Sequence, residues 1–307
     1  MRKLRISIVQ YLNTAPLVWG FTHGPLRDKY DLSFTFPSQC AEALRSGAAD
    51  IAIIPAIEYQ RIDDLMILPD MAIASKNRVR SLLIVSKVPI EGAHGIALDS
   101  GSRSTQALTK ILCDRSWKIA PRFFEMPANL GAMLERADAA LLIGDPALRF
   151  SIEIESRATR GPSGEQVCRA DSAGIPCAST LHVYDVVEEW RKMTGLPAVL
   201  AVWAARRELA TPEVTEDFQT SLCLGLQHLG EISERAAIEL GLPAEELQRY
   251  LAENINFTLD EENLQGLTAY FTLAAAMGLI PRANAVAIAG SRHKAVRYMD
   301  FVLAKSS

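Results

Sequence analysis

Short apolar runs rich in β-branched residues alternate along the chain with segments of helical periodicity. These runs predict strands at residues 4–9, 31–36, 50–54, 71–74 and 81–86. The pattern between them predicts a short helix at 16–21 and a second helix at 38–46, capped by Ser38 and closed by Gly47. Strands that alternate with helices are typical of an α/β fold, in which helices cover a sheet.

The same alternation begins again after residue 93. It predicts a strand at 95–98, a helix at 102–113 and a buried strand at 138–143. Residues 44–55 and 134–145 run in the same order, namely a helix end, an aspartate, an apolar strand and a strand-breaking residue. We therefore expect a structural repeat, with one copy in each of two lobes.

The last third of the chain predicts a returning strand followed by helices. The strand, at 198–203, is expected to rejoin the first lobe, and the helices are expected at 212–240 with a bend near Gly230, at 244–253 and at 259–277. A capping box of Thr258 and Glu261 opens the last helix, which ends at Gly278. This organisation predicts a first lobe of residues 1–92 and 198–307 and a second lobe of residues 93–197.

Two segments fit this organisation less well. Residues 151–180 are polar and contain Gly161-Pro162 and Ile175-Pro176, which indicates a long surface excursion or an insertion. The tail after Arg282 supports no prediction.

Composition narrows the class of protein. The 307 residues are 49% apolar and 22% charged, which allows two ordinary domains with a sizeable core. A net charge of −4 and an isoelectric point near 5.8 provide no global positive field for nucleic acid or an anionic membrane. The apolar run after the basic start is broken at Ser7 and Gln10, so neither an export signal nor a membrane span is expected. We expect a cytoplasmic protein, and the sequence leaves its oligomeric state open.

Reactive and metal-binding motifs are missing from the sequence. The five cysteines are scattered and have no CxxC spacing, which is typical of reduced thiols and not of a disulfide framework or zinc site. The five histidines form neither HxxxH nor HExxH, and no GxSxG, P-loop or GxGxxG motif occurs. We therefore expect no metal site, and the sequence gives no support to a hydrolase, an NTPase or a Rossmann dehydrogenase.

Two loops are the candidate binding elements. Residues 10–16 follow the first strand, and residues 99–105 follow the first strand of the second half. In open α/β sheets, ligands bind beyond the carboxyl ends of strands, where the positive N-termini of helices point. Two such loops facing each other would hold a dianion. The alternative is that their Ser, Thr and Asn side chains only cap helices.

Three further side chains have two readings each. Arg103 is placed to bind a carboxylate in a bidentate manner, or else is a solvated residue at a helix start. Ser81 opens a strand, where it would donate to a ligand or serve as an ordinary strand serine. Asp145 ends a buried strand and would be a base or the N-cap of the next helix.

The segment Tyr11–Leu17 resembles the YLNxxPL segment of the chorismate dehydratases of menaquinone biosynthesis by the futalosine route. Further segments follow that family's order at residues 54–59, 79–81, 98–105, 142–145, 188–190, 194–197 and 202–203. Gly101 departs from the pattern, because a second serine is common there, and residues 151–180 are longer and more polar than in the family.

The resemblance implies a two-lobed, type II periplasmic-binding-protein-like fold with a ligand cleft between the lobes. It implies a hydro-lyase that converts chorismate to 3-[(1-carboxyvinyl)oxy]benzoate and water without a cofactor, with Asn13 and Ser81 at the catalytic centre. The substrate's own enolpyruvyl carboxylate and a side chain such as Asp145 are both candidate bases. The two loops and their surroundings supply the expected substrate-binding residues, which are Tyr11, Thr14, Ser100, Ser102, Arg103, Ser104 and Asp145.

Two alternatives remain from the sequence. The related 1,4-dihydroxy-6-naphthoate synthase carries an SPCPND-like first loop and a catalytic histidine in the other lobe, whereas this chain has Tyr-Leu-Asn and no histidine in its second-lobe loops. A solute-binding or sensor protein for a small carboxylate would bring an export signal, a lipobox or an attached helix-turn-helix, and none is seen.

Overall fold

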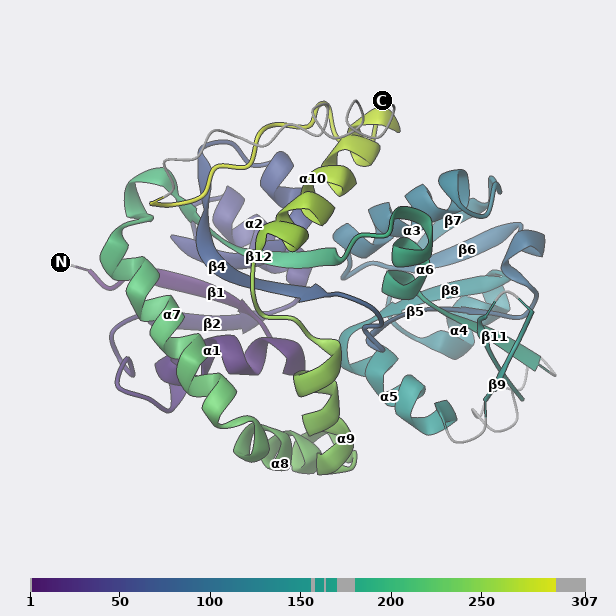
Figure 1. Cartoon of the computed structure of the whole chain (residues 1–307), viewed down its shortest axis with the longest axis horizontal. Coiled ribbons are helices and arrows are strands. Elements are labelled where there is room, and N and C mark those ends of the chain that lie inside the picture. Colours follow the sequence, from purple (N-terminus) through teal and green to yellow (C-terminus); the bar gives the residue numbers. More distant parts are fainter. Residues whose placement is uncertain (1, 156–157, 163, 170–179, 291–307) are drawn as a thin grey trace.

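The computed structural model describes residues 2–155, 158–162, 164–169 and 180–290. Within these residues the strands form two sheets, which lie side by side (Figure 1). The first sheet has the order β2-β1-β3-β12-β4 and the second the order β7-β6-β8-β5-β11-β10-β9. The predicted two-lobed α/β architecture is therefore confirmed.

The first sheet consists of β1 (Arg5–Val9), β2 (Asp31–Thr35), β3 (Ile51–Pro55), β4 (Leu65–Ser75) and β12 (Ala198–Arg206). The second consists of β5 (Leu82–Ser86), β6 (Gly95–Asp99), β7 (Arg122–Met126), β8 (Ala139–Ile143), β9 (Thr159–Arg160), β10 (Gln166–Arg169) and β11 (Thr180–Asp185).

The helices are α1 (Ala15–Thr22), α2 (Pro37–Arg45), α3 (Ser104–Arg115), α4 (Leu130–Arg136), α5 (Gly144–Glu155), α6 (Val186–Thr194), α7 (Pro212–Gln227), α8 (Leu229–Leu240), α9 (Ala244–Arg249) and α10 (Glu261–Ala276). Short 3₁₀ turns include η1 (Leu12–Thr14) and η2 (Ala56–Gln60), and a π-helical turn, η6 (Tyr250–Asn254), continues α9.

The two sheets share one pattern of pairing. In each, the first strand (β1 or β6) lies parallel to the next two strands of the chain, β2 and β3 or β7 and β8. The third strand of each set then pairs antiparallel with a strand from elsewhere, β12 or β5, which itself pairs antiparallel with β4 or β11. The similar segments 44–55 and 134–145 contain β3 and β8, so the predicted structural repeat is confirmed.

Strand β5 belongs to the second sheet, where it lies between β8 and β11. The predicted lobes of 1–92 with 198–307 and 93–197 would place it in the first lobe. The limits of the lobes remain a proposal. The pairing of β5 favours placing the point where the chain first passes from one lobe to the other between Ser75 and Leu82. The sequence did not reveal this, because β5 looks like any other apolar strand.

A large apolar core continues from one sheet to the other. It includes Ile6 and Ile8 of the first sheet together with Ile96 and Leu98 of the second. Strand β5 is buried on both faces, since its even-numbered side chains pack into this core and its odd-numbered ones, such as Leu83, pack into a smaller core of the second lobe. The lobes are therefore joined by apolar packing as well as by the chain.

Two predicted helix starts are wrong. Helix α2 begins at Pro37 with Phe36 in the N-cap position, so Ser38 lies inside the helix. Helix α10 is capped by Asp260, whose carboxylate accepts the Asn263 N–H at 2.9 Å, and not by Thr258. In both cases another residue within two positions favours a different helix start. Pro37 suits the first turn of α2, and Asp260 is a second capping side chain before α10.

The described parts of residues 151–180 and of the tail after Arg282 contribute to the edges of the two sheets. β9 and β10 extend the second sheet by antiparallel pairing beyond β11, whereas residues 156–157, 163 and 170–179 of the expected insertion lie outside the described residues. Ala289 donates its N–H to the Ile67 carbonyl at 2.9 Å, so the described start of the tail runs along β4.

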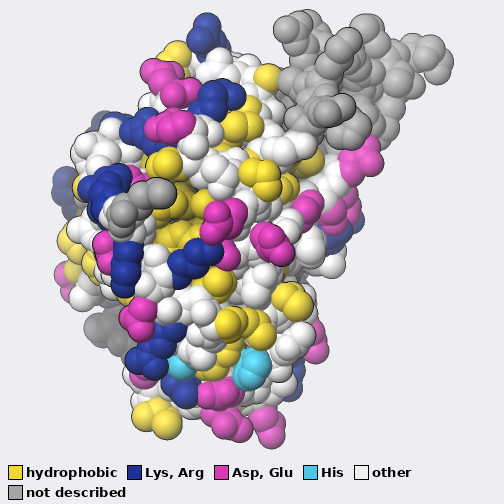
Figure 2. Space-filling model, turned by 90° about the vertical axis from the view of Figure 1, so that its left-hand side faces the viewer, with side chains coloured by type: hydrophobic (Ala, Val, Ile, Leu, Met, Phe, Trp, Pro, Cys, Tyr) yellow, Lys and Arg dark blue, Asp and Glu magenta, His cyan; other side chains and the backbone are white. Residues whose placement is uncertain are grey.

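The surface carries both signs of charge. On the face shown in Figure 2, Lys and Arg side chains are interspersed with Asp and Glu, which agrees with the small net charge. Among the helices of the described residues, none has the length and apolar character needed to cross a membrane.

Helix α1, which follows the first candidate loop, packs closely on α7. Ser221 of α7 accepts the Gly20 N–H at 3.0 Å and donates to the Leu17 carbonyl at 2.9 Å. At Gly225 an added Cβ would lie 1.9 Å from the Pro16 carbonyl oxygen, so only glycine allows this approach.

We expect Gly225→Ala to lower the free energy of unfolding by about 1–3 kcal/mol, because α1 must move away from α7. The matched control is Gly230→Ala, since Gly230 lies in α8 and an added Cβ there meets nothing within 4 Å. Denaturant unfolding of both variants tests this, and equal stability of the two would contradict the account.

Candidate active site

The first-lobe loop brings Asn13 to the carboxyl edge of the first sheet. Strand β1 ends at Val9, and η1 turns the chain into α1. The Asn13 side chain is buried, with 8% of the residue exposed, and accepts the Thr14 hydroxyl at 3.4 Å. Thr14 holds the N-cap position of α1, which no side chain caps. The alternative reading of Asn13 as a helix cap is therefore wrong.

The second-lobe loop ends in an uncapped helix. Arg103 occupies the N-cap position of α3, and no side chain bonds to the first turn. The N–H groups of that turn have no partner within the helix and carry its positive end. The Arg103 guanidinium is half-buried and makes no hydrogen bond or ion pair with any residue that the structure describes. This loop is suited to an anion.

The two loops meet at a cavity of about 60 Å³ between the lobes. It is lined by Val9, Tyr11, Asn13, Pro37, Pro55, Ile73, Leu82, Ser102, Arg103, Ser104, Thr105, Ile143, Gly144, Leu200 and Ala201. Four predicted site residues thus lie together with Asn13, and Thr105 is an addition that the sequence reading did not single out. Arg103 is charged, and none of the lining residues is an Asp, Glu, His or Lys.

Tyr11 forms one wall of this cavity. Its ring lies against Gly144, where φ is +66° and an added Cβ would lie 2.6 Å from the ring. Burial raises the pKa of the Tyr11 hydroxyl, and the nearby Asp99 and Asp145 raise it further. Tyr11 is therefore a neutral phenol at physiological pH.

Ser81 lies deeper, just before β5. It is fully buried and is not among the cavity-lining residues, and its hydroxyl accepts that of Tyr250 at 2.9 Å. Burial raises the pKa of Tyr250, and hydrogen bonding with Ser81 and Asn13 partly offsets the rise. Tyr250 therefore connects the two predicted catalytic residues, although no motif in the sequence marks it.

Ser100 lies away from the cavity, whereas Ser104 lines it and also contacts the first lobe. Ser100 is exposed, and its N–H donates to the Met126 carbonyl at 2.9 Å. The Ser104 hydroxyl accepts the Ile57 N–H at 3.2 Å, which ties α3 to η2 of the first lobe. Ser104 thus takes part in holding the lobes together, and it also lines the cavity with Ser102 and Arg103.

Asp145 lies outside this cavity. Its carboxylate accepts the Leu12 N–H at 3.1 Å, and the residue borders two other pockets, of about 330 and 590 Å³. It is not an N-cap, since α5 begins at Gly144. Burial raises its pKa from the ordinary 3.8 to about 6, while the Leu12 N–H and Arg149 act in the opposite direction. Asp145 thus holds the first-lobe loop from the second lobe.

Within the described parts of the chain, no group of three or more His, Cys, Asp or Glu side chains is placed to hold a metal ion.

We expect Asp145→Asn to separate this tethering from a role as base. The amide still accepts the Leu12 N–H, and kcat should stay within about twofold, whereas loss of a general base typically costs about 10²–10⁴-fold. Because the folded state holds the Asp145 proton more tightly than the unfolded state, the contribution of Asp145 to stability falls as pH rises from about 4 to about 6.

The variant lacks this loss and should melt at a higher temperature than the wild type at pH 7, with a smaller difference at pH 4. Melting curves and turnover across this range check both expectations. A large fall in kcat would restore Asp145 as the base.

The sequence and structure are similar to known proteins over most of their length. A family model described as menaquinone biosynthesis matches residues 4–276. The chain is 29% identical over 283 residues to the chorismate dehydratase of Thermus thermophilus, a match that covers 91% of this chain and 97% of that protein.

Solved structures share the fold at low identity. A protein from Archaeoglobus fulgidus has a TM-score of 0.69 at 22% identity, covering 91% of this chain and 98% of that one. The alkanesulfonate-binding protein of Xanthomonas axonopodis pv. citri, solved with bound MOPS, has a TM-score of 0.61 at 18% identity, covering 92% and 95%. The aliphatic sulphonate-binding protein of Escherichia coli has a TM-score of 0.60 at 16% identity, covering 97% and 94%. The predicted periplasmic-binding-protein-like fold is confirmed.

Proposed function

The chain belongs to the menaquinone biosynthesis family, and we propose that it acts there as a chorismate dehydratase. The reaction removes water from chorismate and leaves 3-[(1-carboxyvinyl)oxy]benzoate. The chorismate dehydratase named above supports this proposal, since it is similar over nearly its whole length. The observation that carries it is the cavity where Arg103 of one lobe, which pairs with no described residue, meets Asn13 of the other.

The chemistry needs little from the protein's own acids and bases. The ring carboxylate of chorismate acidifies the C3 hydrogen through the conjugated double bond. Loss of that proton gives a dienolate, and departure of the 4-hydroxyl then makes the ring aromatic. Since none of the described residues that line the cavity carries a carboxylate, imidazole or ammonium group, we assign the base to the substrate's enolpyruvyl carboxylate.

Substrate binding falls to the second-lobe loop. Chorismate is a dianion, and Arg103, the uncapped first turn of α3 and the hydroxyls of Ser102 and Thr105 provide charge and donors for one carboxylate. This contact fixes the ring relative to Asn13 on the opposite lobe.

The cavity of about 60 Å³ has room for only a few water molecules. Pockets that hold small organic ligands measure about 300–1,000 Å³. We therefore propose that the lobes separate to admit chorismate.

The direct test is incubation of the purified protein with chorismate, followed by chromatography for the aromatic product. We expect product without added metal or nucleotide, and the same yield after exhaustive chelation. Binding of chorismate without product would favour a solute-binding or sensor protein. Turnover only of a later intermediate would favour a 1,4-dihydroxy-6-naphthoate synthase.

We expect Arg103→Ala to raise KM, because the carboxylate loses its charged partner. Truncation of such a desolvated contact typically costs about 2–5 kcal/mol, or at least tenfold in affinity. Arg122→Ala is the control, since Arg122 is an exposed arginine of the same lobe on β7. A KM for Arg103→Ala within twofold of wild type would remove Arg103 from the binding site.

Asn13 is expected to matter for turnover more than for binding. Its amide is placed to donate to the departing hydroxyl or the dienolate, whose charge develops in the transition state. Losing one such preorganised donor lowers kcat about 10²–10³-fold. Asn13→Ala and Asn13→Asp should therefore lose turnover and keep a melting temperature near that of wild type. Near-normal kcat with a lowered melting temperature would give Asn13 a purely structural role.

A further inference from the structure

Three residues at a spacing of four hold the segment that carries Ser81. They are Glu246 of α9 with Tyr250 and Asn254 of the following π-helical turn, and we call them the 246/250/254 face. Glu246 pairs with the Arg80 guanidinium at 3.0 Å, Tyr250 donates to the Ser81 hydroxyl at 2.9 Å, and Asn254 donates to the Arg78 carbonyl at 3.1 Å. The face thus bonds to three of the four residues from 78 to 81.

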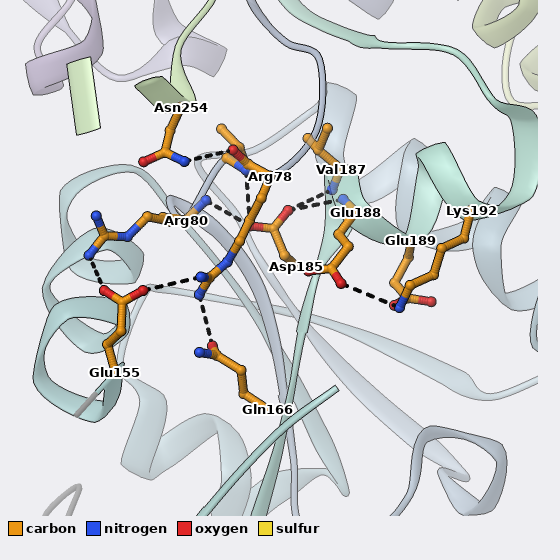
Figure 3. Close-up of polar contacts among 11 residues, drawn as sticks. Arg78, Arg80, Glu155, Gln166, Asp185, Val187, Glu188, Glu189, Lys192 and Asn254 are labelled. Atoms are coloured by element: carbon orange, nitrogen blue, oxygen red, sulfur yellow. Dashed lines mark hydrogen bonds and ion pairs between the residues drawn. The ribbon is translucent and has the colours of Figure 1, made fainter. Parts of the chain in front are cut away.

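The same segment is fixed from its other side by Asp185 at the end of β11. One oxygen of this buried carboxylate accepts the N–H groups of Val79 at 3.0 Å and Arg80 at 2.7 Å (Figure 3). Arg80 has a φ of +63°, in the left-handed region that non-glycine residues rarely adopt. Its buried side chain also pairs with Glu155 of α5, at 2.5 Å (Figure 3). The backbone entering Ser81 is therefore held in one conformation.

This mounting restricts the Ser81 hydroxyl. A serine hydroxyl donates one hydrogen bond and accepts up to two. Burial raises the pKa of Tyr250, so its phenol stays protonated and acts as the donor. Because the Tyr250 hydroxyl donates to one lone pair of the Ser81 oxygen, the Ser81 hydroxyl proton points away from Tyr250 and is free to donate to another acceptor. The Asn13 amide lies beside the same phenol, since hydrogen bonding with it lowers the Tyr250 pKa.

We propose that Tyr250 is a positioning residue for Ser81 and, through the shared phenol, for Asn13. This inference rests on the proposed dehydration of chorismate. Tyr250 holds the two side chains in the geometry that stabilises the departing hydroxyl and the dienolate, and it does not itself contact the substrate. The 246/250/254 face serves as its mount.

The test is Tyr250→Phe, which keeps the ring and removes only the hydroxyl. We expect kcat to fall about tenfold, the effect of one well-placed hydrogen bond, with KM within about twofold. The control is Tyr184→Phe, because Tyr184 is equally buried and its hydroxyl accepts the Ile90 N–H at 3.0 Å in another part of the second lobe. The control should keep wild-type kcat. Melting temperatures of both show whether each variant is folded.

A double-mutant cycle with Ser81→Ala decides whether Tyr250 acts through Ser81. If it does, Tyr250→Phe should lower kcat much less in the Ser81→Ala background than in the wild type. Two equal effects, or a wild-type kcat for Tyr250→Phe, would overturn the inference while leaving the proposed function in place. A folded wild type that yields no aromatic product would overturn both.

A second pair of variants tests the 246/250/254 face while leaving the Tyr250 and Ser81 hydroxyls unchanged. Glu246→Gln and Glu155→Gln each remove one carboxylate partner of Arg80, but only Glu246 lies on the 246/250/254 face. We expect Glu246→Gln to lower kcat about threefold and Glu155→Gln to lower it less, since Glu155 holds Arg78 and Arg80 from α5 and does not position Tyr250. Equal kcat for the two variants would contradict the role of the face.

Discussion

The buried carboxylate of Asp185 is the interaction on which the arrangement of the site depends. Its two oxygens accept four backbone N–H groups, from Val79, Arg80, Val187 and Glu188. Burial raises the pKa of this carboxyl, and the backbone donors counteract the rise. The Asp185 side chain therefore caps α6 and also fixes the backbone just before β5, where the chain passes from the first sheet to the second.

That fixed entry places Ser81 next to Tyr250, and Tyr250 next to Asn13. Asp145 adds a second tie between the lobes through the Leu12 N–H, and Ser104 adds a third through the Ile57 N–H. The polar atoms of these ties hold backbone. At the cavity, Arg103 makes no hydrogen bond or ion pair with the described residues, and the first turn of α3 has no side-chain cap. The side chains proposed for the chemistry are thus held in place, and Arg103 is left to bind an anion when the lobes separate to admit the substrate.

Periodicity in the sequence predicted most strands and the repeat, because buried strands and helix ends have local signatures. It did not place β5, since an apolar strand does not encode which sheet it joins. It also assigned two helix caps wrongly, because Pro37 and Asp260 compete locally with Ser38 and Thr258.

The candidate site was predicted only in part, because local sequence signatures reveal loops but not contacts between distant residues. Loops after strands are visible in the sequence, so Tyr11, Asn13, Ser102, Arg103 and Ser104 were all found and do line one cavity. Tyr250 was missed because its partner Ser81 lies 169 residues away. The role of Asp145 stays a prediction from sequence, because a carboxylate at a strand end has the same sequence signature whether it faces the cleft or a neighbouring backbone N–H.

The central claim is that the protein supplies binding and donors at the cleft while the substrate supplies the base. The pH dependence of kcat for chorismate tests it most directly. We expect a kcat that does not change from about pH 5.5 to 9, because the substrate carboxylates titrate below this range and none of the described residues that line the cavity is an Asp, Glu, His or Lys. An acidic limb with an apparent pKa near 6 that disappears in Asp145→Asn would contradict the claim and make Asp145 the base.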